Sequence, residues 1–67
     1  MLGNLYVEIK NKRITQTQIA KLLNLSINSV NFKIRGKSEF TRQEMFLIQE
    51  KLFPDKELEY LFRKLEG

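Results

Sequence analysis

The stretch TQTQIAKLLNLSINSVNFKIRG, residues 15–36, carries two helix-start signals in close succession and decides the fold. The first signal is a capping box, in which Thr15 takes the N-cap position and Gln18 follows three residues later. Ile14 and Ile19 flank the box at the spacing of a hydrophobic staple, which fixes how the chain enters a helix. These residues predict a helix that begins directly after Thr15.

The second signal lies a few residues further on. We expect the first helix to end near Asn24, because asparagine tolerates the left-handed conformation that terminates many helices. Ser26 then caps a second helix, Ile27 to about Arg35, which ends at Gly36. Two helices separated by a short turn, the second with a polar outer face, are typical of a helix-turn-helix. A plain helical hairpin has the same spacing, so spacing alone favours neither.

One more helix is expected before this stretch, from about Leu2 to Lys10. Leu5 and Ile9 give it an apolar stripe at positions i and i+4. No alternation of polar and apolar residues is long enough to predict a strand anywhere in the chain. The sequence therefore predicts an all-α fold.

Two further helices are expected after the stretch. Thr41 and Glu44 repeat the capping box, and the helix that they start runs to Phe53, where Pro54 ends it. Asp55 is expected to cap the last helix. The apolar side of that helix would be made by Leu58, Leu61, Phe62 and Leu65. We expect a compact five-helix domain, and a single domain over residues 1–67.

The composition narrows the possible functions. The chain has 67 residues, with 42% hydrophobic and 30% charged residues, as in an ordinary folded domain. It has no cysteine and no histidine, which excludes disulfides, thiolate chemistry, Cys/His zinc sites and the commonest general base. We therefore expect no enzymatic activity, no metal and no cofactor. No apolar run approaches the ~20 residues that span a bilayer, so we expect a cytoplasmic protein without membrane contact.

The positive charge is concentrated in the first half of the chain. Residues 1–37 contain seven lysines and arginines against the single acid Glu8, a net charge of +6. Residues 38–67 contain five basic and seven acidic residues, a net charge of −2. This asymmetry favours a polyanionic partner for the first half. The alternative is a basic surface that is merely solvated.

Residues 15–41, TQTQIAKLLNLSINSVNFKIRGKSEFT, resemble the Xre/Cro-like helix-turn-helix family of phage repressors and bacterial regulators. The matching positions are Thr15-Gln16, Ile19-Ala20, Leu23, Asn24, Leu25-Ser26, Val30 and Gly36-Lys37. Residues 40–62, FTRQEMFLIQEKLFPDKELEYLF, also look like a phage-repressor subgroup whose fourth helix ends in Phe-Pro. The resemblance covers nearly the whole chain and implies a lambda-repressor-like fold.

The sequence departs from the family pattern at two places. Asn24 stands where relatives usually have the turn glycine, a small change if the turn is left-handed. Lys33 stands where many relatives have an apolar core residue, and Ile34 follows it. This displacement predicts that the second helix of the motif is rotated slightly about its axis.

The outer face of that helix is the expected DNA-reading surface. With Val30 and Ile34 buried, the residues facing outward would be Asn28, Asn31, Phe32 and Arg35, with Ser26 and Ile27 at the leading end. Asparagine suits adenine, arginine suits guanine or a phosphate, and Phe32 or Ile27 suits a thymine methyl group. Alternatively, Phe32 covers a neighbouring loop or a second copy of the chain. Ile27 is equally compatible with core and groove.

Phosphate contacts are expected around this face. The start of the helix after Thr15 offers backbone N–H groups and a dipole that favour an anion, which points to Gln16 and Thr17. The family resemblance adds Lys37 and Ser38, just past Gly36. Further positive charge would come from Lys21, Lys33 and Arg42. The resemblance also implies a homodimer on a near-palindromic operator, for which Leu47 and Tyr60 are candidate contacts.

The function that these features predict is sequence-specific binding of double-stranded DNA by a transcriptional regulator. The resemblance implies a Cro-like or repressor protein of phage or prophage origin that competes with polymerase at an operator, although activation is also compatible. The chain fits a complete Cro-like protein or the DNA-binding part of a longer repressor. The alternative function is a small protein-interaction module, such as an antitoxin or anti-repressor, that keeps the same fold.

Overall fold

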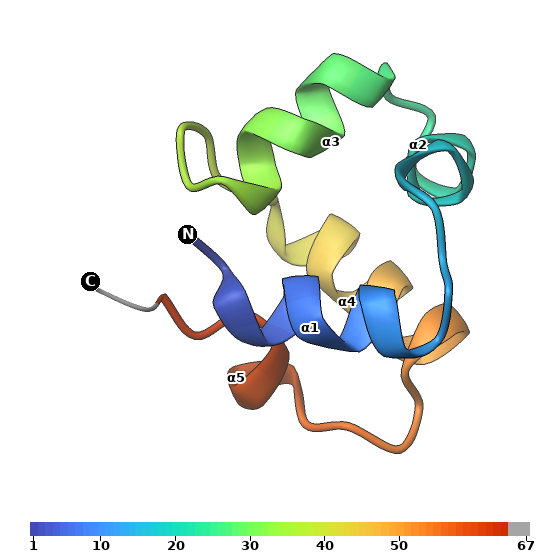
Figure 1. Cartoon of the computed structure of the whole chain (residues 1–67), viewed down its shortest axis with the longest axis vertical. Coiled ribbons are helices and arrows are strands. Elements are labelled where there is room, and N and C mark those ends of the chain that lie inside the picture. Colours follow the sequence, from blue (N-terminus) through green and yellow to red (C-terminus); the bar gives the residue numbers. More distant parts are fainter. Residues whose placement is uncertain (65–67) are drawn as a thin grey trace.

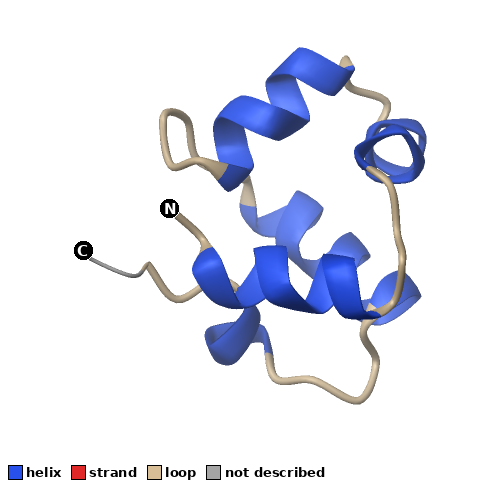
Figure 2. Ribbon diagram, in the orientation of Figure 1, coloured by secondary structure: helices blue, strands red, loops and turns tan. Residues whose placement is uncertain are grey.

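A computed structural model of the chain describes residues 1–64, and five helices follow one another along it (Figure 1). The helices are α1 (Gly3–Asn11), α2 (Gln16–Leu23), α3 (Ile27–Ile34), α4 (Arg42–Leu52) and α5 (Leu58–Leu61). The described residues form helices and loops and contain no strand (Figure 2). The all-α, five-helix prediction is confirmed.

Side-chain caps fix the starts of α2 and α4. The Thr15 hydroxyl accepts a hydrogen bond from the backbone N–H of Gln18 at 3.1 Å, and Gln18 Oε1 accepts one from the backbone N–H of Thr15 at 2.7 Å. Thr41 and Glu44 make the same two bonds at 3.1 and 2.8 Å. Each box satisfies backbone donors that a helix end leaves unpaired, an effect of about 1 kcal/mol per cap. Both predicted capping boxes are confirmed.

The turn between α2 and α3 depends on Asn24. This residue has φ 58° and ψ 45°, the left-handed conformation, and the backbone N–H of Leu25 closes the turn on the carbonyl of Ala20 at 2.9 Å. The Ser26 hydroxyl then accepts the backbone N–H of Ser29 at 3.1 Å and starts α3. After α3 the chain turns at Gly36, whose φ is +85°. The predicted turn residues and the Ser26 cap are confirmed.

The prediction for the last helix was wrong in its start and its length. α5 contains only Leu58–Leu61, and Glu57 precedes it without a side-chain cap. Asp55 does not cap this helix, because it lies in the turn two residues before the N-cap position; its carboxylate is 3.6 Å from the ammonium of Lys12. Leu65, predicted on the apolar side of this helix, lies outside the described residues.

A single core joins all five helices. Helices α2 and α3 pack against each other, α4 packs against α2 and α5, and α1 crosses both α3 and α5. In the view of Figure 1, α3 and α2 lie above and beside the layer formed by α1, α4 and α5. The buried apolar side chains are Leu2, Leu5, Ile9, Ile19, Ala20, Val30, Ile34, Phe40, Ile48, Phe53 and Leu61. The predicted inner sides of α1 (Leu5 and Ile9) and α3 (Val30 and Ile34) both belong to this core.

A polar cluster ties α1 to α5 at the edge of the core. Glu8 is buried, and its carboxylate accepts a hydrogen bond from the Tyr60 hydroxyl at 2.8 Å. This hydrogen bond raises the pKa of the Tyr60 hydroxyl above its ordinary value. The side chain of Asn4 donates to the Tyr60 carbonyl at 2.9 Å. Tyr60, predicted as a dimer contact, is therefore half-buried and bonded within its own chain.

None of the helices formed by residues 1–64 is both long enough and apolar enough to cross a membrane.

Candidate nucleic-acid interface

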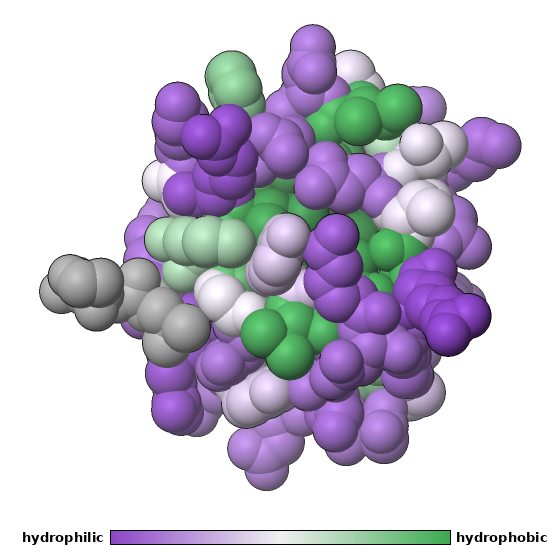
Figure 3. Space-filling model, viewed as in Figure 1, coloured by the Kyte–Doolittle hydropathy of each residue, from purple (hydrophilic) through white to green (hydrophobic). Residues whose placement is uncertain are grey.

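The outer face of α3 carries the exposed aromatic side chain that the sequence predicted. Val30 and Ile34 are buried, whereas Phe32 keeps 50% of its surface exposed. Ile27, for which the sequence left core and groove open, is 49% exposed and so belongs to the outer surface. Ser26, Asn28 and Arg35 are also exposed, and Asn31 is half-buried. Figure 3 shows a largely polar surface in this view, with apolar side chains appearing in separate places.

The loop after α3 folds back beside Phe32. The backbone N–H of Lys37 donates to the Phe32 carbonyl at 2.9 Å, and the Lys37 ammonium lies 5.7 Å from the centroid of the Phe32 ring. Gly36 permits this reversal because its φ of +85° is unfavourable for other residues. The loop therefore places Lys37 and the neighbouring exposed Ser38 next to the outer face of α3, without covering the Phe32 ring.

The first turn of α2 is connected to α3 by a side-chain contact. The amide nitrogen of Asn31 donates to Gln16 Oε1 at 3.4 Å, a long hydrogen bond. Gln16 and the exposed Thr17 are the first residues of α2, where backbone N–H groups have no carbonyl four residues before them within the helix. The positive end of the α2 dipole thus lies beside the outer face of α3.

A shallow hollow at this junction brings in two residues that the sequence analysis missed. Tyr6 and Lys10 from α1 line it together with Gln16 and Asn31. The Lys10 ammonium lies 5.3 Å from the centroid of the Tyr6 ring, so the two side chains stack at positions i and i+4. An aromatic residue outside the buried stripe, followed four residues later by a lysine, is the sequence signal that marks this pair.

Ion pairs neutralise one part of the molecule and leave another part basic. Within residues 1–64 the paired groups are Lys12 with Asp55, Lys33 with Glu44, Lys56 with Glu8, and Lys64 with Glu39. Each of these pairs involves α4, α5 or the segments that lead into and out of them.

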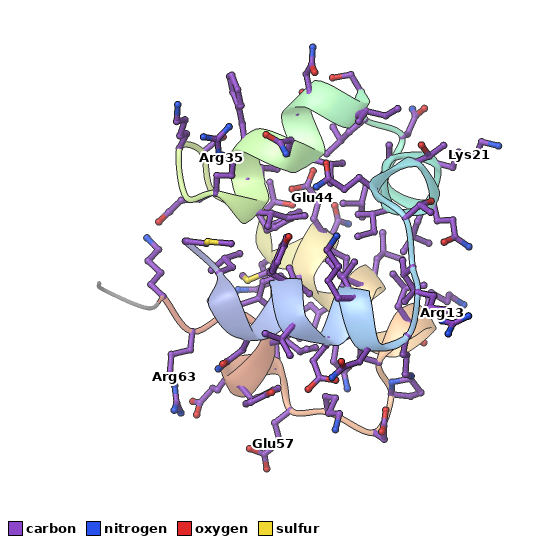
Figure 4. The ribbon with its side chains drawn as sticks, in the orientation of Figure 1. Arg13, Lys21, Arg35, Glu44, Glu57 and Arg63 are labelled. Carbon is purple, nitrogen blue, oxygen red and sulfur yellow. The ribbon has the colours of Figure 1, made fainter. Side chains whose placement is uncertain are left out.

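The cations of the first half of the chain are distributed differently. Among residues 1–64, no carboxylate lies within 4.0 Å of the charged groups of Lys10, Arg13, Lys21, Arg35 and Lys37. Of the carboxylates in the described residues, those without such a pair are Glu50, Glu57 and Glu59, all in α4 or the α5 region. Figure 4 shows Lys21 on α2 and Arg35 beside α3, with Glu57 and Arg63 at the opposite end of the molecule. Arg42, Lys51 and Arg63 also have no ion pair, but the three unpaired acids of the same region offset their charge. The excess of unpaired positive charge therefore lies on α1 to α3 and the loops that follow them.

Lys33 does not belong to this basic surface, although we expected it to add charge there. Its ammonium is largely buried, 3.2 Å from Glu44 Oε1 and 2.9 Å from the Glu39 carbonyl that accepts its hydrogen bond. Burial raises the pKa of the Glu44 carboxyl, but the hydrogen bond from Thr41 and the nearby Lys33 outweigh it and leave the pKa below its ordinary value. Lys33 is thus half-buried at the inner side of α3, with its charge paired within the chain.

The described residues 1–64 hold no group of three or more His, Cys, Asp or Glu side chains placed to bind a metal ion. The outer face of α3 and its surroundings present side-chain amides, the Phe32 ring, the Ile27 side chain and unpaired cations. Comparison of the chain with protein-family models, with curated proteins and with solved structures gives no match.

Proposed function

We propose that this chain binds double-stranded DNA as a transcriptional regulator, with α2 and α3 acting as a helix-turn-helix and α3 lying in the major groove. The observation that carries the proposal is the set of unpaired cations around α2 and α3, beside a helix face made of exposed amides and apolar side chains. Positive charge of this kind supplies affinity for phosphates, and groups of this kind read bases. The family resemblance of residues 15–62 supports a phage or prophage repressor or a Cro-like protein.

The dimensions of α3 are compatible with this role. Its eight residues have a length of about 12 Å, and a helix with side chains is about 10–12 Å across. The major groove of B-DNA is about 12 Å wide and admits one helix. In this arrangement Gln16, Thr17, Lys37 and Ser38 are the groups that contact phosphates on either side of the groove. These contacts fix the position of the protein, and α3 supplies the sequence preference.

The salt dependence of binding tests this proposal. We expect log K for a duplex to fall linearly with log salt between about 50 and 200 mM, because bound cations release counterions from DNA. Lys37→Ala removes one phosphate contact and should reduce the magnitude of the slope by about 1. Arg63→Ala is the matched control, since Arg63 is exposed at the end of the molecule away from α3 (Figure 4). Fluorescence anisotropy with a labelled duplex measures both variants.

Two results would contradict the proposal. Duplex binding that does not respond to salt would mean that phosphates are not the partner. Equal slopes for the Lys37→Ala variant and the wild-type chain, with a reduced slope for the Arg63→Ala variant, would mean that DNA contacts the end of the molecule near Arg63 and not the surface around α3.

A protein-interaction module is the second candidate function, and one feature favours it. Val7 on α1 and Phe46 on α4 are 50% and 47% exposed and lie outside the α2–α3 surface. Exposed apolar side chains away from a DNA-binding face are available for a protein partner. An antitoxin or anti-repressor that acts through these residues would bind its partner with little salt dependence, and substitution of Val7 or Phe46 would weaken it.

A further inference from the structure

We infer that α3 reads an A·T-rich half-site through two pairs of side chains, each consisting of one amide and one apolar group. This inference rests on the proposed DNA-binding function and specifies which DNA it selects. The first pair is Asn28 with Phe32, and the second is Ile27 with Asn31. All four residues lie on α3, and each pair has the spacing i, i+4.

The helix geometry places the two pairs side by side. Residues four apart on a helix are neighbours on its surface, with Cβ atoms about 5–6 Å apart. The first pair lies opposite the buried Val30, and the second lies along the edge of the same outer face. Phe32 and Ile27 are each about half exposed, so the ring and the alkyl chain are available to a partner. The outer face therefore presents amide and apolar groups in two adjacent rows.

This pattern matches the major-groove edge of an A·T base pair. Adenine offers N7 as acceptor and its N6 amino group as donor, which an asparagine amide pairs with in a bidentate manner. Thymine offers a methyl group, which is the apolar feature of the groove. An amide next to an apolar side chain is thus complementary to the two halves of one A·T pair, or to neighbouring A·T pairs.

The groups that read G·C pairs occur only at the C-terminal end of this face. Guanine is read best by arginine or lysine and cytosine by aspartate or glutamate. No acid occurs between Glu8 and Glu39 in the sequence. Lys33 is turned inward to Glu44, and Arg35 is the C-cap residue at the very end of α3. Any G·C pair should therefore lie at the edge of the half-site, near Arg35 and the neighbouring Lys37.

The amides of the two asparagines are free to different degrees. Among residues 1–64 the Asn28 side chain has no hydrogen-bond partner, so both the oxygen and the nitrogen of its amide are available to adenine. One N–H of the half-buried Asn31 amide donates to Gln16, which leaves the other N–H and the oxygen for a base. Asn28 should accordingly discriminate more strongly than Asn31.

Selection of bound duplexes from random-sequence DNA, with the wild-type chain, is the first test. We expect A·T pairs at the inner positions of each selected half-site, with any G·C pair confined to one edge. A G·C-rich half-site would overturn the inference while leaving the DNA-binding proposal intact. If no duplex is enriched and none binds, the proposed function fails and this inference fails with it.

Chemical substitution in the selected DNA is the second test, and it needs no protein variant. Uracil in place of thymine removes only the 5-methyl group, and we expect about a fourfold loss of affinity for each methyl that is contacted. 7-Deazaadenine in place of adenine removes the N7 acceptor and should weaken binding at the positions that Asn28 reads. Unchanged affinity for the uracil-containing duplexes would overturn the assignment of Phe32 and Ile27.

Combining the two kinds of change assigns the contact to one residue. In the Phe32→Ala variant, uracil at one thymine position should cost nothing further, because the group that contacts the methyl is already gone. Phe46→Ala is the matched control, because Phe46 is an equally exposed phenylalanine on α4, and it should keep the full fourfold sensitivity. Retained sensitivity at every thymine in the Phe32→Ala variant would overturn the role given to Phe32.

Discussion

Phe32 shows how one residue connects the fold with the proposed function. Its neighbours on the helix, Val30 and Ile34, are buried in the core, and its own ring is half exposed beside the Lys37 ammonium. A single exposed phenylalanine is common on protein surfaces and needs no explanation by itself. What makes Phe32 informative is its surroundings, because exposed asparagine and unpaired cations flank it. An apolar ring in such a setting suits a partner that is apolar at one point and anionic around it.

The change Phe32→Ala should separate binding from folding. We expect the specific binding free energy to weaken by about 1–3 kcal/mol, because a base-edge contact is lost, while binding to random-sequence duplexes barely changes. The thermal midpoint should shift little, because the ring is half exposed in the folded state. Anisotropy titrations with both duplexes and a thermal melt measure these quantities. If the variant instead unfolds at a much lower temperature, the Phe32 ring is mainly a packing element.

At the scale of elements, the capping box of α4 connects local structure with a tertiary ion pair. Glu44 accepts the backbone N–H of Thr41 and lies 3.2 Å from the ammonium of Lys33 on α3. The Glu44 carboxylate thus caps the start of α4 and also pairs with a lysine of α3. Glu44 neutralises the charge of Lys33, so the inner side of α3 carries no unpaired charge, and Lys33 does not extend onto the outer face.

This arrangement predicts a specific pH dependence of stability. The pKa of Glu44 lies below its ordinary value of 4.5 in the folded chain, so its stabilising effect is present above pH 4.5 and is lost as the pH falls through the lowered pKa. Glu44→Gln keeps the size of the side chain but removes this titration. We expect its free energy of unfolding, from urea titrations at several pH values, to be lower than that of the wild type at pH 7. The difference should shrink on acidification.

Glu39→Gln is the control for Glu44→Gln, because Glu39 also forms a carboxylate–lysine ion pair but is exposed. Glu39→Gln removes an exposed carboxylate that pairs with Lys64, and solvent screening makes such a surface pair weak. Its free energy of unfolding at pH 7 should stay close to that of the wild type. A Glu39→Gln loss as large as the Glu44→Gln loss would contradict the special role given to Glu44.

Local signals in the sequence predicted these elements well. The capping boxes at Thr15 and Thr41, the left-handed Asn24 and the glycine turn at Gly36 depend on residues within one turn of each other, and all are present. The sequence could also predict the outer face of α3, because Val30 and Ile34 define the opposite side by helical periodicity.

The errors arose where distant residues compete with local signals. Asp55 is a favourable residue type for a helix cap and follows Pro54, but α5 begins three residues later, and the Asp55 carboxylate instead lies near Lys12 at the end of α1. Lys33 resembled a surface cation until α4 brought Glu44 beside it. Ile27 lies only ~60° from Val30 around the helix, so periodicity could not decide whether it was buried. Each of these outcomes depends on tertiary packing, which a single sequence does not contain.

On the scale of the whole molecule, the distribution of charge and the size of the domain both bear on how it would lie on DNA. Among residues 1–64, the ion pairs leave the first half of the chain with an excess of positive charge. In α4 and the α5 region, Arg42, Lys51 and Arg63 balance the unpaired Glu50, Glu57 and Glu59, so that end of the molecule is nearly neutral. In the proposed function, the field of the polyanion would orient the approaching molecule so that its basic end faces the DNA. The part of the chain that the structure describes extends 27 Å along its longest axis, which is shorter than the ~34–36 Å between successive major-groove faces. Two copies can therefore occupy adjacent half-sites on one side of the duplex without overlapping.

This fit predicts how binding depends on half-site spacing. Two half-sites about 10 bp apart, centre to centre, present the same face of the DNA and should bind two copies cooperatively if the copies contact each other. Moving one half-site by about 5 bp puts it on the opposite side of the duplex, so we expect two copies still to bind but independently, with a lower overall affinity. Titrations followed by analytical ultracentrifugation give the stoichiometry and the affinity of each step. Equal affinities at both spacings would mean that the two copies make no contact on DNA and that each chain acts as a monomer.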